Sequence, residues 1–136
     1  MLEGIRVVEL ATYIAAPAAA GVMADWGAEV IKVEPLQGDA IRGMLRNVSA
    51  ANVEGNPIFD MDNRGKRGLA IDLRTEKGAA ALRKLVLSAD VFLTNVRPGG
   101  LARAGLDWDS LHAENPRLIY ASVTGYGLEG GEKDRP

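Results

Sequence analysis

The sequence contains no cysteine among its 136 residues, which excludes disulfide bonds, zinc–thiolate sites and thiol catalysis. It has a single histidine, and aromatic residues make up only 5% of the chain. No apolar run reaches the roughly 18 residues that a membrane span needs. Glu3 and Glu9 interrupt the N-terminal apolar stretch, so a secretory signal is not predicted. We therefore expect a cytoplasmic protein with no membrane association.

The composition is that of one globular domain, with 47% hydrophobic and 25% charged residues. The net charge of −2 argues against a general nucleic-acid binder. The charge is unevenly spread, because residues 42–103 carry 11 Lys and Arg against 6 Asp and Glu. This basic middle stretch is suited to an anionic ligand, although a solvated surface with a chance imbalance explains it equally well.

Apolar runs alternate with amphipathic stretches along the chain, which predicts an α/β fold. Strands are expected at residues 5–10, 29–34, 69–73, 90–94 and 118–124, and helices at residues 17–26, 75–88 and shortly after 107. Each strand–helix–strand unit implies a parallel pair, so the prediction is a Rossmann-like parallel sheet with flanking helices. Three helices cannot cover both faces of five strands, so we expect this fold to be incomplete by itself and to keep apolar surface exposed.

Local signals set the expected ends of these elements. Pro17 suits the first turn of a helix and Gly27 its end, and the nearly all-apolar stretch between them predicts a buried helix. Thr75 and Asp107 are candidate N-caps. Residues 35–68 show little periodicity, which predicts a long and partly irregular connection of the kind that is often functional.

A glycine-rich stretch follows the last predicted strand. Residues 125–130 match the pattern G-x-G-x-x-G of dinucleotide-binding sites. That fingerprint also requires a helix beginning at the glycines and an acidic residue about 20 positions later. Gly131, Lys133 and Pro136 follow instead. A flexible loop close to a ligand is therefore the favoured interpretation, with dinucleotide binding as the alternative.

Residues 95–100, which read Asn-Val-Arg-Pro-Gly-Gly, directly follow another predicted strand. Ligands of open parallel sheets bind at the carboxyl ends of the strands, where Asn95 can donate and accept hydrogen bonds. Arg97 and Arg103 are suited to binding phosphate. An ordinary turn is the alternative.

Two further groups of polar residues favour structural roles. Residues 60–67 are rich in charge but lack the full calcium-loop pattern, so a charged surface turn is expected. His112 lies near Trp108 and Leu111 in the short helix predicted after Asp107, which favours a partly buried structural histidine. No Ser-His-Asp set or metal cluster can be assembled around it, and no metal is expected.

Taken in order, these motifs resemble the N-terminal portion of the family III CoA-transferase superfamily, which contains formyl-CoA transferase, carnitine CoA-transferase and α-methylacyl-CoA racemase. The resemblance extends over essentially the whole chain. It is carried by Leu2 to Leu10, Pro17, Asp25 to Glu34, Gly38-Asp39 with Arg42, Asn63 to Arg67, Ile71 to Leu73, Asp90 to Gly99, Leu106, Asn115 to Tyr120 and Ser122 to Gly127. The chain differs from some members at Thr12, Ile14, Pro35 and Thr124.

The resemblance implies that residues 1–136 form a coenzyme A-binding Rossmann-like segment of a larger domain. Coenzyme A or acyl-CoA would be the substrate, together with a carboxylic acid, and the parent protein would be an interlocked homodimer. The implied coenzyme A contacts are Ile71, Asp72, Leu73, Arg74, Asn95, Val96, Arg97, Arg103, Thr124, Gly125, Tyr126 and Gly127. The basic stretch fits this, since arginine binds phosphate well.

The resemblance also implies how such an enzyme works. A transferase of this family moves CoA between acids through an aspartate, which forms a mixed anhydride and then an aspartyl-CoA thioester. That aspartate is expected beyond the last residue, so no catalytic residue is assigned here and the chain alone is expected to be inactive. Two alternatives stay open: part of a racemase, which would use acid–base residues, and a non-catalytic module that binds CoA or another nucleotide.

Overall fold

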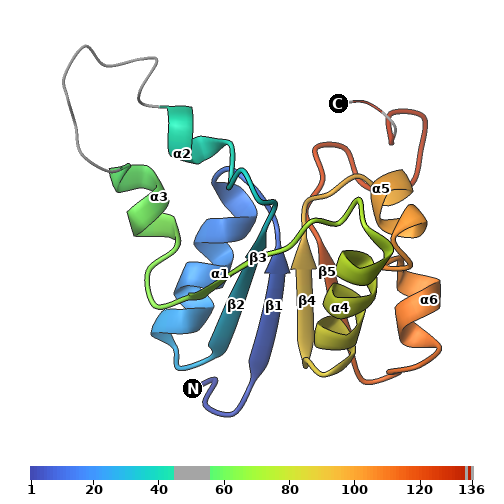
Figure 1. Ribbon diagram of the computed structural model, residues 1–136, viewed down its shortest axis with the longest axis horizontal. Coiled ribbons are helices and arrows are strands. Elements are labelled where there is room, and N and C mark those ends of the chain that lie inside the picture. The colour runs from blue at the N-terminus through green and yellow to red at the C-terminus, as the bar shows by residue number, and fades with distance from the viewer. Residues whose placement is uncertain (45–55, 134, 136) are drawn as a thin grey trace.

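Five parallel strands form the single sheet of this protein, for which the computed structural model describes residues 1–44, 56–133 and 135 (Figure 1). The order across the sheet is β3-β2-β1-β4-β5, and every neighbouring pair is parallel. The strands are β1 (Arg6–Leu10), β2 (Glu29–Glu34), β3 (Arg67–Ala70), β4 (Val91–Thr94) and β5 (Ile119–Ser122). The predicted α/β parallel sheet is confirmed.

Helices cover the sheet on both sides. They are α1 (Ala15–Asp25), α2 (Ile41–Met44), α3 (Pro57–Asp62), α4 (Glu76–Leu87), α5 (Pro98–Arg103) and α6 (Trp108–His112). Helix α1 packs on one face of the sheet, and α4, α5 and α6 contribute to the core on the other face (Figure 1). The predicted N-caps are confirmed, because the side chain of Thr75 accepts from Gly78 N and that of Asp107 from Ser110 N.

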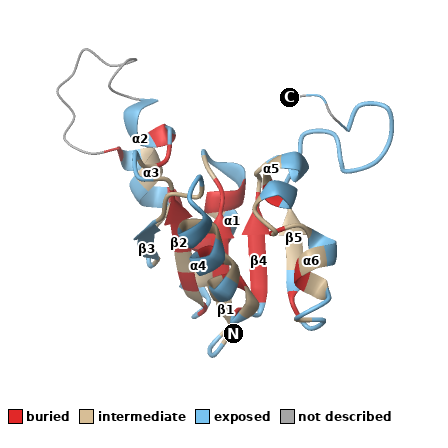
Figure 2. Cartoon of the chain, turned by 45° about the vertical axis from the view of Figure 1, so that its right-hand side comes forward, coloured by how far each residue is buried: buried red, intermediate tan, exposed pale blue. Residues whose placement is uncertain are grey.

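The core is densest around β1 and β4, which lie at the centre of the sheet (Figure 2). All four residues of β4 are buried, as expected for a parallel strand covered on both faces. Phe92 is completely buried beside Leu82 and Val86 of α4. The continuous apolar run that identified β4 in the sequence is therefore a direct result of its central position.

Helix α1 differs from its prediction. A helix buried all round was expected, but Val22 and Trp26 are 39% and 48% exposed. The buried side is narrow and made of small residues, so α1 lies close to the sheet and to α3. A Cβ placed on Gly21 would lie 2.8 Å from the carbonyl oxygen of Asp62 in α3. The helix ends as predicted, with Gly27 at φ +97°.

Two further expectations are corrected. The third strand was predicted at residues 69–73, but the observed strand β3 begins two residues earlier, at Arg67. All four residues of β3 are exposed, so its sequence shows no alternation of buried and exposed residues. Residues 98–103 were not predicted to be helical, because two glycines follow the proline, but they form α5. The connection over residues 35–68 contains α2 and α3, and its residues 45–55 lie outside the described part.

The outer strands keep apolar side chains exposed. Ile119 on β5 is 62% exposed and Leu69 on β3 is 38% exposed. The central strands β1 and β4 are almost entirely buried. The helices of this chain therefore cover the middle of the sheet and leave its two edges open. Within the described residues, no helix is long and apolar enough to cross a membrane.

Candidate functional site

The candidate site lies at the carboxyl edge of the sheet, where the chain leaves β1 and β4 toward opposite faces. The segment after β1 enters α1, which packs on one face, and the segment after β4 enters α5, which packs on the other. This reversal of strand order is the topological switch point at which parallel α/β sheets bind ligands. The predicted residues Asn95, Val96 and Arg97 follow β4 at this point.

Two reciprocal hydrogen bonds join the two segments at the switch point. The backbone N–H of Thr12 donates to Asn95 Oδ1 at 3.0 Å, and Asn95 Nδ2 donates to the carbonyl oxygen of Thr12 at 2.8 Å. Just below them, Thr94 Oγ1 donates to the carbonyl oxygen of Leu10 at 2.8 Å. The amide of Asn95 is thus engaged with the backbone, and its predicted contact with coenzyme A stays a prediction.

The first cavity at this edge, the glycine-loop pocket, has a volume of about 390 Å³. Six of the predicted ligand residues, three after β4 and three after β5, meet here. Its lining is Asn95, Val96, Arg97, Pro98, Val123, Thr124, Gly125, Tyr126, Lys133 and Arg135. The charged residues of this lining are all cationic, which suits an anionic ligand. The loop itself is turned by Thr124 Oγ1, which accepts from Gly127 N at 2.8 Å.

This loop contradicts the dinucleotide alternative. No helix begins at the glycines, since the described residues between 123 and 135 form turns and bends and are exposed. Without a helix N-terminus, the backbone amides that would hold a pyrophosphate are not aligned. The favoured interpretation, a flexible loop close to a ligand, stays a prediction; the loop is exposed and lies beside a cavity.

The second cavity, the arginine pocket, has a volume of about 400 Å³ and lies between α4 and α5. It brings together predicted residues that are about 30 positions apart in the sequence. Its lining is Leu73, Arg74, Thr75, Glu76, Ala79, Ala80, Arg83, Arg103 and Ala104. Three of these residues are arginines and one is a glutamate, so this cavity also favours an anion.

The three arginines of this pocket differ in the hydrogen bonds and ion pairs that they form. Arg83 donates to the carbonyl oxygens of Gly105 and Ser110 and pairs with Glu114, so it ties α4 to α6. Arg74 forms two 2.9 Å hydrogen bonds to the carboxylate of Asp72, which lower the pKa of Asp72 to about 2. Arg103 forms no ion pair with any residue that the structure describes. Arg103 is therefore the arginine of this pocket most available to a ligand.

Not every predicted residue lines these cavities. Ile71 lines neither cavity and packs partly against the core, as does Leu73, which also lines the arginine pocket. Asp72 and Gly127 lie beside the pockets without lining them. The structure thus brings the predicted segments to one edge of the sheet but divides them between two cavities.

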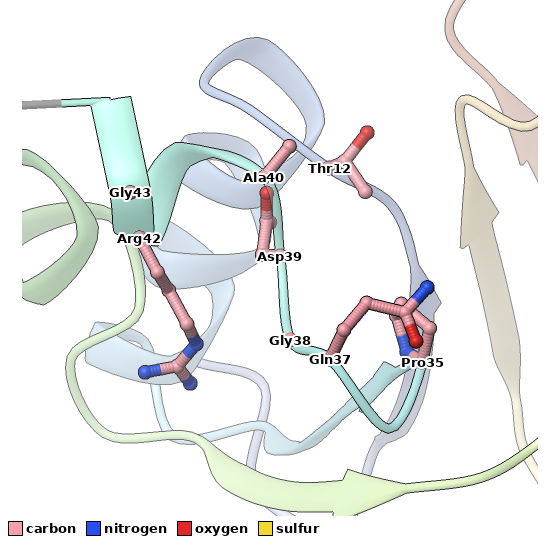
Figure 3. A pocket seen from close by; sticks show the side chains of 8 residues that line it. All are labelled: Thr12, Pro35, Gln37, Gly38, Asp39, Ala40, Arg42 and Gly43. Carbon is pink, nitrogen blue, oxygen red and sulfur yellow. The ribbon is translucent and has the colours of Figure 1, made fainter. Parts of the chain in front are cut away.

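A third cavity, the Gly38 pocket, was not identified from the sequence. Its volume is about 600 Å³, and it lies between the segment after β1 and the segment after β2 (Figure 3). Thr12 forms one wall and Gly38, Asp39 and Ala40 the opposite one, while the guanidinium of Arg42 is turned away from Thr12. That guanidinium pairs with Glu34 at 2.7 Å and lowers the pKa of Glu34.

Sequence reasoning also missed a buried ionic network beneath this pocket. Lys32 Nζ lies 2.8 Å from Glu9 Oε1 and 3.1 Å from Asp39 Oδ2. Lys66 Nζ donates to Glu9 Oε2 at 2.6 Å, and burial lowers the pKa of Lys66. Glu9, Lys32 and Asp39 are each no more than 2% exposed. The alternation of Glu9 and Lys32 with valines was the available signal, because polar residues inside a central strand must be paired.

The network corrects one interpretation of residues 60–67. They were expected to form a charged surface turn, but Asp62 and the side chain of Lys66 are each 2% exposed. His112 behaves as expected, stacked on Trp108 with ring centroids 4.1 Å apart. No group of three or more His, Cys, Asp and Glu side chains within residues 1–44 and 56–133 is arranged to hold a metal ion.

Comparison with known families decides the identity of the chain. The family model of CoA-transferase family III matches residues 2–136. The chain belongs to CoA-transferase family III. The resemblance noted in the sequence is thereby confirmed.

Named family III relatives are similar along the full chain. A (R)-2-hydroxy-4-methylpentanoate CoA-transferase of Clostridioides difficile is 44% identical over 137 residues, which cover 100% of this chain and 34% of the relative. A succinate–glutarate CoA-transferase of Agrobacterium fabrum is 44% identical over 138 residues, covering 98% of this chain and 34% of the relative. The chain therefore spans about a third of the length of the curated relatives it matches.

A solved structure agrees with the fold. The crystal structure of a CAIB/BAIF family protein from Brucella suis has a TM-score of 0.88 and 43% sequence identity. The match covers 98% of this chain and 36% of that one. The Rossmann-like sheet of this chain is thus the arrangement found in that CAIB/BAIF family protein.

Proposed function

We propose that this chain is the coenzyme A-binding N-terminal part of a family III CoA-transferase that moves CoA between carboxylic acids. The observation that carries the proposal is that two separate cavities with cationic linings are formed by segments that leave the carboxyl edge of the sheet. Coenzyme A is an elongated ligand with phosphates at one end, so separate cationic cavities suit it better than one compact cavity.

Arg97 and Arg103 are the proposed phosphate ligands. Both are exposed, and neither forms an ion pair within the described part of the chain. Arg74 is already held by Asp72, so its proposed contribution is smaller unless the ligand displaces that carboxylate. The peptide groups of the glycine loop have open space beside Gly125 and Gly127, which lets a ligand approach the backbone closely.

The chemical step is proposed to use an aspartate outside these 136 residues. Its carboxylate oxygen would attack the thioester carbonyl and release the CoA thiolate, leaving a mixed anhydride. The thiolate would then attack the aspartyl carbonyl of the anhydride, freeing the donor acid and forming an aspartyl-CoA thioester. The acceptor carboxylate would reverse these two steps, which restores the aspartate. In the described chain, Glu34, Asp39 and Asp72 at this edge are each held by a cation instead.

The test is an acyl-exchange assay with the full-length protein. An acyl-CoA donor is mixed with (R)-2-hydroxy-4-methylpentanoate, succinate or glutarate, the acids named for the relatives, and new CoA thioesters are measured by chromatography. Transfer and a covalent protein–CoA thioester in the mass spectrum are expected. Exchange of the α-proton without transfer would indicate the racemase, and binding of CoA without either reaction would indicate a non-catalytic module.

The isolated 136-residue chain is expected to be inactive in the same assay, since no nucleophile is assigned to it. Transfer by the purified chain above a blank would contradict this expectation. The proposed interlocked homodimer is supported by the open apolar edges of the sheet, which a second chain or further segments could cover.

A further inference from the structure

The segment after β1 contains an unusual backbone conformation. Tyr13 has φ +65°, and it is the one non-glycine residue with positive φ among the residues that the structure describes. An L-residue other than glycine, asparagine or aspartate disfavours this left-handed region by roughly tenfold in population. The side chain of Tyr13 is 53% exposed, so its burial does not explain the conformation.

Asp39 holds this conformation from the opposite wall of the Gly38 pocket. Its Oδ1 accepts from the backbone N–H of Tyr13 at 3.2 Å and from that of Ile41 at 3.1 Å. Figure 3 shows Asp39 and Ala40 facing Thr12 across the pocket. One buried carboxylate oxygen therefore connects the segment after β2 with the segment after β1.

The carboxylate of Asp39 is itself fixed by the strands. Its Oδ2 lies 3.1 Å from Lys32 Nζ as an ion pair, without the alignment of a hydrogen bond. Lys32 Nζ donates in addition to Glu9 Oε1 at 2.8 Å and to the carbonyl oxygen of Ala11 at 3.0 Å. The network thus runs without interruption from β1 and β2 to the backbone of Tyr13.

The segment that is held here lies between two cavities. Thr12 lines the Gly38 pocket and, on its other side, is bonded to Asn95, which lines the glycine-loop pocket. Asp39 from one side and Asn95 from the other therefore determine where the Thr12–Tyr13 backbone lies. A shift of this backbone would change the shape of both cavities together.

We propose that Asp39 is a positioning residue that holds the Thr12–Tyr13 backbone in its left-handed conformation and thereby sets the affinity of the carboxyl edge for CoA. This role rests on the proposed function, because it concerns the ligand of the same edge. It differs from simple core stabilisation, since it acts through the conformation of one exposed residue.

The test compares four single variants and one double variant of the full-length protein by calorimetric titration with CoA and by thermal unfolding. Asp39→Ala is expected to bind CoA about tenfold more weakly, which corresponds to ~1.4 kcal/mol. Asp90→Ala is the matched control, because Asp90 Oδ2 also accepts a backbone N–H, that of Arg6, but at the opposite edge of the sheet. Its affinity for CoA is expected to stay unchanged.

The remaining two variants address Tyr13 directly and leave the buried network intact. Tyr13→Val should weaken CoA binding about tenfold, because a β-branched residue strongly disfavours positive φ. Tyr13→Gly should bind as the wild type does, and it should restore much of the affinity lost in Asp39→Ala when the two are combined. A role in core stability alone would predict no rescue and no difference between valine and glycine.

The outcomes separate the two proposals. If the wild type binds no CoA, the proposed function fails and this role fails with it. If the wild type binds CoA but Tyr13→Val binds as tightly as Tyr13→Gly, the positioning role alone is overturned. The Tyr13 pair decides the matter even if Asp39→Ala does not fold.

Discussion

At the scale of single residues, polar side chains at the carboxyl edge divide into those engaged with the protein and those available to a ligand. Asn95 uses its amide to bond Thr12, and Arg74 is held by Asp72. Arg97 and Arg103 project from the surface instead. The sequence could place all of these residues at one edge, because each follows a predicted strand or helix. It could not separate the two classes, since pairing depends on contacts between distant segments.

Arg103→Ala is expected to weaken CoA binding by the full-length protein. The lost charge-assisted contact to phosphate is worth about 1.5–3 kcal/mol when it is shielded from water and less at an exposed position. Calorimetric titration measures the change, with Lys77→Ala on α4 as a control outside the pockets. Equal affinity of Arg103→Ala and wild type would remove Arg103 from the proposed site.

The ion pair of Asp72 predicts a specific dependence of stability on pH. Arg74 lowers the pKa of Asp72 from its ordinary value of 3.8 to about 2, so the folded state favours the ionised carboxylate. This stabilisation is complete above pH 4 and is lost as the pH falls from about 4 to 2. Melting temperatures of wild type and Asp72→Asn should therefore converge across this window. A constant difference down to pH 2 would contradict the assigned pKa.

At the scale of helices and strands, the sequence predicted the elements in which the buried residues follow a regular pattern. The four-residue run of β4 is buried throughout, and α4 shows its apolar stripe through Leu82 and Val86. The sequence missed α5 and displaced β3, because α5 contains two glycines and β3 is exposed along its length. The sequence signalled that Glu9 and Lys32 inside strands need partners, but it did not identify Lys66, which lies 57 positions from Glu9.

Gly78 in α4 offers a test at this scale. Replacing a helical glycine by alanine normally stabilises a helix by about 1 kcal/mol. Here the new Cβ would lie 2.0 Å from the carbonyl oxygen of Asp72, so Gly78→Ala is expected to destabilise the protein and to displace the turn before α4. Denaturant unfolding should show this loss. Gly43→Ala in α2, where a Cβ meets nothing within 4 Å, should leave stability equal or higher.

At the scale of the whole molecule, the centre of the sheet is covered and its edges are not. Ile119 on β5 and Leu69 on β3 keep apolar surface in contact with water. The chain also spans only about a third of its relatives' length. Both observations support the proposal that further segments or a second subunit cover these edges in the complete protein.

The purified 136-residue chain is accordingly expected to self-associate or to have a low melting temperature. Exposed apolar edges favour contact between copies, and binding of any partner to the folded state raises its stability. Light scattering combined with a heat-denaturation scan measures both properties. A monodisperse monomer with a sharp transition at high temperature would mean that the chain is sufficient as a domain.

The all-parallel arrangement has a consequence for synthesis on the ribosome. The central strand β1 is made first, yet its neighbour β4 follows much later, as the bond between Thr94 and Leu10 spans 84 positions. At a translation rate of about 5–20 residues per second, β1 waits roughly 4–17 seconds for that neighbour. Helix α1 can shield Val7 early in this interval, but Val8 faces the other side of the sheet and has to wait for Leu82 and Val86 of α4. We therefore expect the nascent chain to bind chaperones that recognise emerging apolar segments.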